Sequence, residues 1–141
     1  MKLKVLVIIL CIISNNAFAK TKKVDNNLQC IVRTTVAEAE NQSLTAKMGV
    51  MHTIHNRMLY YKKTSCNIVN RRNQFSHRRV RIGPEHQYLY NLAANILSGY
   101  VPDNTNGAFF FHDDSLKRNP FRRTIKTAKY DNMLFYRRRV G

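Results

Sequence analysis

One glutamate holds a position that suits acid–base chemistry. Glu38 follows apolar residues that recur at spacings of three and four, the pattern of an amphipathic helix. On a helical wheel it falls about 90° from the centre of that apolar stripe, where the buried face meets the exposed one. Partial burial raises the pKa of a carboxyl group, so a side chain there could donate a proton near neutral pH. On position alone, a surface glutamate near a helix end is the simpler interpretation.

A second acid group is harder to assign. Most glycosidases use two carboxylates at a defined separation. Glu40 is two residues from Glu38 and would point to the far side of the same helix. Asp103, Asp113 and Asp114 lie near a predicted strand and could face the same cleft, but no spacing selects one of them. The existence of a second catalytic carboxylate therefore stays open.

The histidines offer a weak case for metal binding. His52 and His55 are three residues apart and would share a helix face, and His112 precedes two aspartates. No acidic or cysteine ligand accompanies the first pair, so we expect His55 to be a hydrogen-bonded core residue. We expect no metal and no cofactor. A secreted metal-dependent nuclease that uses these histidines remains a weaker alternative.

The elements that must position these residues read as one small domain. Pro84 suits the first turn of a helix, and Gly99 suits the position after its end. The predicted helices cover residues 28–39, 44–59 (with Ser43 as N-cap) and 84–98, and the predicted strands cover 108–112 and 133–137. Residues 60–82 read as a basic, loop-rich part. The class is therefore α+β, with helices first and a small sheet late.

The first nineteen residues have the three parts of a secretory signal peptide. Lys2 and Lys4 precede an apolar run over residues 5–13, and Ala17-Phe18-Ala19 forms a cleavage site with small residues at its first and third positions. The apolar run is too short to cross a bilayer core of roughly 30 Å as a helix. We therefore expect cleavage after Ala19, a secreted or periplasmic protein, and a mature domain over residues 20–141.

Two cysteines remain after that cleavage, Cys30 and Cys66. In an oxidising compartment an even pair predicts a disulfide. If the chain were not exported, two free buried thiols would be the better interpretation.

The charge of the chain predicts an anionic neighbour. Among 141 residues, 24 Lys and Arg oppose 8 Asp and Glu, which gives a formal charge of +16. A hydrophobic fraction of 44% excludes a disordered basic tail, and the length excludes two ordinary domains. Aromatic residues alternate with the basic ones only at Tyr60-Tyr61-Lys62-Lys63, so we expect no specific nucleic-acid binding. A secreted cationic protein that binds membranes or nucleic acid without cutting glycans is the runner-up hypothesis.

Several short motifs follow one another along the chain in a specific order. They are the helix end Cys30–Gln42, Asn56-Arg57, Cys66-Asn67-Ile68-Val69, Gln74-Phe75-Ser76, Leu97-Ser98-Gly99, Asp103–Ala108, Phe111-His112 and Phe135-Tyr136-Arg137. In this order the segments resemble the SleB-type cell-wall hydrolase family, the spore-cortex-lytic enzymes and their relatives. The resemblance spans roughly residues 28–138 and implies a small, mainly helical, lysozyme-like single domain.

The resemblance implies a chemistry and a substrate. Glu38 corresponds to the catalytic glutamate of the family, which cuts the β-1,4 bond between MurNAc and GlcNAc in peptidoglycan. The family is similar to lytic transglycosylases, in which the muramyl 6-hydroxyl attacks its own C1 and leaves a 1,6-anhydro end, so that one acid suffices. Hydrolysis of muramidase type stays open, as does a role in a bacterium's own wall growth or in the lysis programme of a phage, that is, as an endolysin.

The remaining site residues are chosen by their chemistry. Gln74, Ser76, His112 and Tyr136 are candidates for the cleft wall, because amide and hydroxyl groups both donate to and accept from sugars. The basic runs would hold the enzyme near anionic polymers of the cell envelope. We expect no transmembrane segment after signal cleavage, and a monomer.

Overall fold

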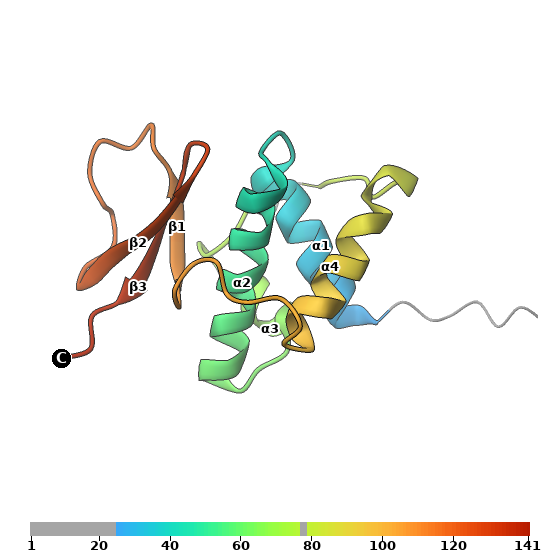
Figure 1. Cartoon of the computed structure of the whole chain (residues 1–141), viewed down its shortest axis with the longest axis horizontal. Helices are drawn as coiled ribbons and strands as arrows, with labels where there is room; N and C mark the ends of the chain where they lie inside the picture. Colours follow the sequence, from blue (N-terminus) through green and yellow to red (C-terminus); the bar gives the residue numbers. More distant parts are fainter. Residues whose placement is uncertain (1–24, 77–78) are drawn as a thin grey trace, which may run out of the picture.

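Helices come first in the chain and strands come last (Figure 1). The structure is a computed structural model that describes residues 25–76 and 79–141. Its elements are α1 (Asn26–Ala39), α2 (Leu44–Tyr61), α3 (Ser65–Val69), a 3-10 turn η1 (Pro84–His86), α4 (Gln87–Leu97), β1 (Phe110–Asp113), β2 (Thr124–Tyr130) and β3 (Met133–Arg138). The expected α+β class is confirmed. The expected signal peptide, residues 1–19, lies outside the described residues.

Helix α1 forms where the apolar repeat predicts it. Asp25 caps its start by accepting a hydrogen bond from the Asn27 amide, a contact that is worth about 1 kcal/mol in such positions. The repeat buries Ile31, Val32 and Val36 against α2, α3 and α4. Glu38 stands beside this stripe and is half-buried, as its place on the helical wheel predicts.

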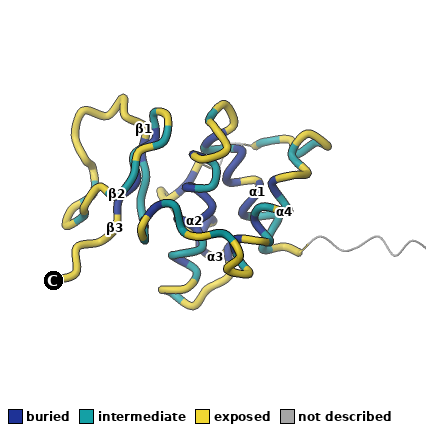
Figure 2. The backbone as a smooth tube through the Cα atoms, in the orientation of Figure 1, coloured by how far each residue is buried: buried dark blue, intermediate teal, exposed yellow. Residues whose placement is uncertain are grey.

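Helix α2 lies between the sheet on one side and α1 with α4 on the other (Figures 1 and 2). Ser43 caps it through a hydrogen bond from the Ala46 amide, as predicted, and the helix runs two residues past the predicted end. Because α2 has neighbours on two sides, more than one face of this helix is buried. His52 is buried at 2% exposure, whereas His55 is half-buried. The prediction that His55 is the core histidine is therefore wrong.

A disulfide joins the first and third helices. Cys30 of α1 is bonded to Cys66 of α3, with their Cα atoms 5.2 Å apart, which confirms the predicted bridge. Closing a loop of 36 residues stabilises the fold by about 3–4 kcal/mol on a chain-entropy estimate. Helix α3 itself falls inside the stretch that was expected to be loop.

The sheet has three antiparallel strands in the order β1-β3-β2. The strand at one edge, β2, was not predicted. Strand β3 pairs Phe135 with Phe111 of β1, and the Phe135 side chain is fully buried. It packs directly on Gly49 of α2, where an added Cβ atom would lie 2.5 Å from the ring carbon Cζ. The sheet therefore meets α2 at a place where only a glycine fits.

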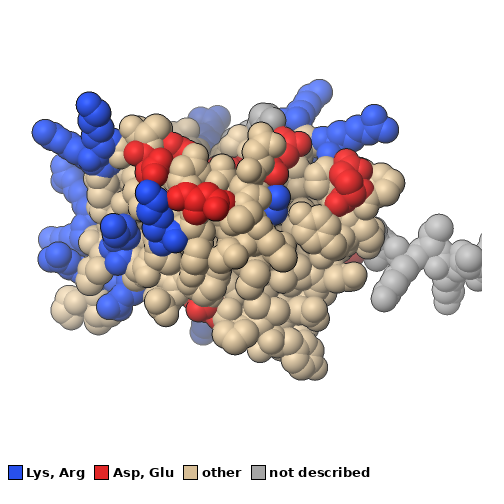
Figure 3. Space-filling view, turned by 45° about the horizontal axis from the view of Figure 1, so that its top comes forward, with Lys and Arg blue, Asp and Glu red and all other residues tan. Residues whose placement is uncertain are grey.

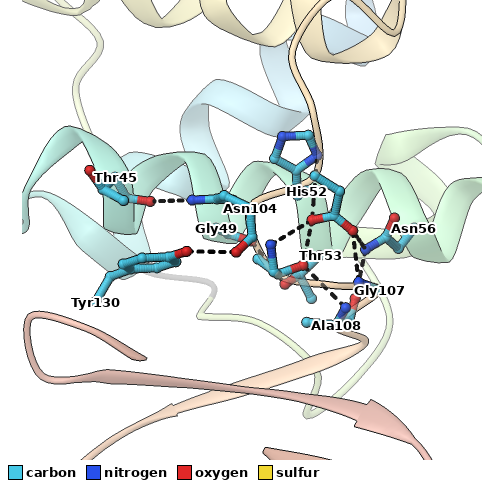
Figure 4. Close-up of polar contacts among 11 residues, drawn as sticks. Thr45, Gly49, His52, Thr53, Asn56, Asn104, Gly107, Ala108 and Tyr130 are labelled. Atoms are coloured by element: carbon cyan, nitrogen blue, oxygen red, sulfur yellow. Dashed lines mark hydrogen bonds and ion pairs between the residues drawn. The ribbon is translucent and has the colours of Figure 1, made fainter. Parts of the chain in front are cut away.

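A loop between α4 and β1 is fastened to α2 (Figure 4). Asp103 accepts hydrogen bonds from the Thr105 amide and hydroxyl and from the Gly107 amide, so its carboxylate closes the turn. The same carboxylate accepts a bond from Asn56 Nδ2 of α2, 2.9 Å away. Because the Gly107 turn leads straight into β1, this network fixes where β1 begins relative to α2.

The next residue of that loop reaches two other elements. Asn104 donates from Nδ2 to the Thr45 carbonyl of α2, and its own carbonyl accepts from the Tyr130 hydroxyl of β2 at 2.6 Å (Figure 4). The loop is therefore bonded to both the helix and the sheet.

Basic side chains gather at the end of the molecule that carries the sheet (Figure 3). The exposed basic residues after position 113 are Lys117, Arg118, Arg122, Arg123, Lys126, Lys129, Arg137, Arg138 and Arg139. Within the same stretch there are two acidic residues, Asp114 and Asp131. We call this set the sheet-end cationic surface. Among the described residues, no helix has the length and apolar character needed to span a membrane.

Candidate active site

A cleft of about 390 Å³ lies between the helical part and the sheet. Glu38 and Gln42, at and just after the end of α1, line one wall with residues 73–76 of the chain that follows α3. Residues 111–113 of β1 and Met133 of β3 line the other wall. Because the two walls belong to different parts of the fold, the packing of sheet on helices sets how far apart they stand.

Glu38 meets Ser76 in this cleft. The Ser76 backbone N–H donates a hydrogen bond to Oε1 of Glu38, although 38 residues separate them. An amide donor helps to fix the orientation of a carboxylate at the end of a flexible side chain. Two candidate site residues from distant parts of the sequence are thus in direct contact.

Gln74 lines the same wall, and a hydrogen bond from the protein interior holds its side chain. Its Oε1 accepts a hydrogen bond of 2.8 Å from Nη2 of Arg57, a buried residue of α2. Arg57 also donates from Nε to the Phe109 carbonyl at 2.7 Å. One guanidinium therefore links the Gln74 segment to the residues just before β1, which places the two walls of the cleft relative to each other.

His112 and Tyr136 form a stacked, hydrogen-bonded pair. Their ring centres are 5.2 Å apart with planes 14° from parallel, and both side chains are buried. Nδ1 of His112 lies 2.6 Å from the Asp113 carbonyl, which can only accept, so Nδ1 carries the proton. In the neutral ring Nε2 then accepts from the Tyr136 hydroxyl, 2.9 Å away. His112 lines the cleft, while Tyr136 lies behind it and orients it.

The three candidate aspartates separate clearly. Asp113 lines the cleft; Asp114 pairs with Lys129 at 2.7 Å, and Asp103 is used in the α2 network. Asp113 accepts hydrogen bonds from the Ser115 amide and from Asn132 Nδ2. Hydrogen bonding to Ser115, from its amide foremost and from its side chain, lowers the pKa of Asp113, so it is a carboxylate near neutral pH.

Two polar residues of the cleft, Gln42 and Asn73, were not predicted as site residues. Gln42 lies just beyond α1, where the helical repeat has ended. Asn73 has a φ of 58°, a left-handed conformation that asparagine tolerates better than most residues. An asparagine before a Gln-Phe-Ser segment could have indicated such a turn, but nothing in the sequence placed it at the cleft.

The histidines of α2 sit apart from the cleft. Nδ1 of His52 is 3.8 Å from Oδ1 of Asp103, and its Nε2 has no hydrogen-bonding partner among the residues described. Burial lowers the pKa of His52 and of His55, with Asp103 opposing the shift in both. In the described part of the chain, no group of three His, Cys, Asp or Glu side chains is arranged to hold a metal ion.

Comparison with known families gives one match. The family described as Cell Wall Hydrolase matches residues 41–136, which is well over half of the chain. The matched region includes residues 73–76 and 111–113 of the cleft and begins three residues after Glu38. No curated protein and no solved structure matches the chain. The extent of the family match shows that the chain belongs to the Cell Wall Hydrolase family.

Proposed function

We propose that the protein is an exported lytic transglycosylase that cuts the β-1,4 bond between MurNAc and GlcNAc in peptidoglycan, with Glu38 as its one catalytic acid. Membership of the Cell Wall Hydrolase family supports a peptidoglycan-hydrolysing role. The observation that carries the finer proposal is the position of Glu38, half-buried in the cleft with one oxygen bonded to the Ser76 amide.

The proposed reaction needs one carboxyl group. Glu38 gives its proton to the glycosidic oxygen, which leaves as the 4-hydroxyl of GlcNAc. The muramyl 6-hydroxyl attacks C1 of its own ring, and its proton passes to the Glu38 carboxylate. The product is a 1,6-anhydro sugar, no water is consumed, and Glu38 returns to its starting protonation state.

Other cleft residues supply contacts for the sugar. Gln74 keeps an amide NH₂ group as a donor, because its Oε1 is used by Arg57. Both ring nitrogens of His112 are bonded to protein oxygens, so its ring is held in a fixed orientation and shapes the cleft wall. Groups that are held before the substrate arrives lose less entropy on binding, which favours precise placement of the scissile bond.

Hydrolysis is the second candidate, because one carboxylate shares the cleft with Glu38. Asp113 lines it and is ionised near neutral pH, so it could activate a water or stabilise a cationic transition state. A hydrolase would add water across the bond and leave a reducing end. The two candidates therefore differ in product mass by one water molecule.

The decisive experiment digests purified sacculi with the mature protein and identifies the products by mass spectrometry. We expect anhydro-muropeptides, and we expect Glu38→Gln to lose activity by about 10²–10⁴-fold, the usual contribution of a general acid. Glu40→Gln is the matched control, because it removes an exposed glutamate two residues away and should stay active.

The outcomes separate the candidates. Reducing ends whose formation depends on Asp113 as well as Glu38 would replace the transglycosylase by a hydrolase. Intact sacculi and no new muropeptides would contradict glycan cleavage altogether and favour the cationic binding protein.

The expected location accords with this role. Cell wall hydrolases are typically extracytoplasmic. The sheet-end cationic surface would hold the enzyme near peptidoglycan and other anionic polymers of the envelope, which raises its encounter rate with the wall.

A further inference from the structure

Arg57 is a buried cation without an acidic partner. Its exposure is 6%, and its two hydrogen bonds go to neutral oxygens of Phe109 and Gln74. No Asp or Glu in the described part of the chain forms an ion pair with it. A buried charge is costly unless an opposite charge faces it, so this position favours an anion from outside the chain.

Aromatic rings and further cations surround Arg57. The guanidinium lies between two aromatic rings, with its central carbon 5.1 Å from the ring centres of both Phe75 and Phe110. Burial lowers the pKa of Arg57 to about 10; Tyr61 opposes this shift, and two further cations nearby, Arg138 and Arg71, add to it. At neutral pH Arg57 is still protonated, so the site has a positive potential that the described residues do not neutralise.

A small cavity opens on this side chain. It measures about 120 Å³, and Arg57 lines it together with Thr53, Phe109, Phe110 and Phe121. Residues 73–75 and Phe111 line both this cavity and the larger cleft that holds Glu38. One ligand could therefore occupy both, with its reacting bond at Glu38 and a side group beside Arg57.

We propose that the Arg57 cavity is a subsite for a carboxylate carried by the muramyl residue of the glycan; the proposal rests on the proposed function. Arginine binds carboxylates through paired N–H donors, and here one edge of the guanidinium is already used by protein oxygens. The cavity of about 120 Å³ is small, which suits a lactyl group better than a peptide.

Two parts of peptidoglycan carry this chemistry. A muramyl residue without its stem peptide has a free lactyl carboxylate, and a peptide-bearing one has free carboxylates along the stem. Either source would present a carboxylate to Arg57. The volume favours the lactyl group, which predicts a preference for glycan chains whose peptides have been removed.

The test measures binding rather than cleavage, so that it is independent of the proposed reaction. The Glu38→Gln protein is titrated with peptide-free glycan fragments, with the same fragments after methyl esterification, and with fragments that keep their stem peptides in acid and esterified form. We expect the peptide-free acid to bind about tenfold or more tightly than its ester. We expect Arg57→Gln in the same background to remove this difference.

Controls keep the test decisive. Arg71→Gln removes a neighbouring positive charge and should keep the difference between acid and ester, because Arg71 does not line the cavity. Arg57→Lys keeps the positive charge without the planar guanidinium, and it should keep part of the difference in binding between acid and ester. The acid–ester comparison with Arg57 intact needs no variant at this position, so a folding defect in Arg57→Gln does not undermine it.

Each outcome has one meaning. Discrimination by the peptide-bearing fragments alone would keep the carboxylate subsite and assign the stem as its source. Equal binding of acids and esters, with Arg57 present, would overturn the subsite. Failure of the wild-type protein to cut sacculi would overturn the proposed function while leaving a measured acid–ester difference in place.

Discussion

At the scale of single residues, the cleft relies on hydrogen bonds that backbone groups make to ionisable side chains. The Ser76 amide holds Glu38, and the Asp113 carbonyl holds the ring of His112. Backbone groups are held in place by the fold itself, so the side chains bonded to them are held in place as well. Substitution of Ser76 by any residue except proline would keep the amide and hence the contact with Glu38.

Protonation of His52 opposes folding. It is buried on α2, and its Nε2 has no hydrogen-bonding partner among the residues described. Burial lowers the pKa of His52 in the folded chain below the unfolded value of about 6.5. The unfolded chain therefore takes up the proton first as the pH falls.

This predicts a loss of stability on mild acidification. Between neutral pH and the folded pKa of His52, the unfolded state binds more protons, so the free energy of unfolding decreases as the pH falls below about 6.5. The slope for one group is at most about 1.4 kcal/mol per pH unit. Urea unfolding at a series of pH values from 7.5 to 5 measures it, and His52→Gln should flatten the slope. An unchanged slope in the variant would contradict this account.

At the scale of elements, α2 is the part on which the sheet and the other helices both pack. Its N-terminal end is also tied to the sheet, because the Ser43 amide donates to Asp131 in the turn between β2 and β3 at 2.6 Å. At its middle, Gly49 admits the ring of Phe135. The close approach of helix and strand therefore depends on the absence of a side chain at one position.

Replacing that glycine should destabilise the protein. A Cβ atom at Gly49 would overlap the ring of Phe135, so Gly49→Ala should lower the free energy of unfolding by about 1–3 kcal/mol, as overpacking does in other cores. Urea unfolding measures the change. Phe135→Leu removes the ring, so the added methyl should cost less in that background, and the double-mutant cycle should show the coupling. Additive effects would mean that the two residues do not clash.

The sequence predicted those elements whose patterns are strong. The long repeats of α1 and α2, the cap at Ser43 and the aromatic start of β1 were found, each within a few residues of its observed bounds. Strand β2 was missed because none of its residues is buried, and its sequence shows no regular alternation of apolar and polar residues. Helix α3 was missed because five residues are too few to show a helical period.

The site was predictable to a similar degree. The place of Glu38 beside a stripe follows from helix geometry alone, and the structure puts it in one cleft with Gln74, Ser76 and His112. Arg57 belongs to a predicted motif but was not predicted as a site residue, because an arginine within a helix is usually exposed. Its burial arises from the aromatic rings of distant segments, which no local pattern reveals.

At the scale of the whole molecule, charge is unevenly distributed. The sheet-end cationic surface carries nine exposed Lys and Arg, whereas two acids, Asp114 and Asp131, lie in that stretch. Exposed charges act over about a Debye length, roughly 8–10 Å at physiological salt. Attraction of this kind speeds the first encounter with an anionic polymer more than it fixes a final pose.

Binding to sacculi should therefore weaken with salt. We expect retention of the Glu38→Gln protein on purified sacculi to fall as NaCl rises from about 50 mM to about 500 mM, because salt screens exposed charges. Replacing Arg122, Arg123 and Lys126 by Gln should reduce the retention at low salt. Replacing Lys62 and Lys63, just after the end of α2, tests charge elsewhere and should do less. Retention that ignores salt would argue against an electrostatic role for this surface.

The contact between Gly49 and Phe135 also bears on what the enzyme could admit. One wall of the cleft belongs to α1 and the segment after α3, and the other belongs to the sheet, which rests on α2 at this glycine. The distance between helix and strand at Gly49 therefore helps to set the width of the cleft between these two walls. A larger residue there would open or tilt the sheet and change the thickness of the polymer strand that passes between the walls. A position that touches no substrate would in this way help to set which strands the protein accepts.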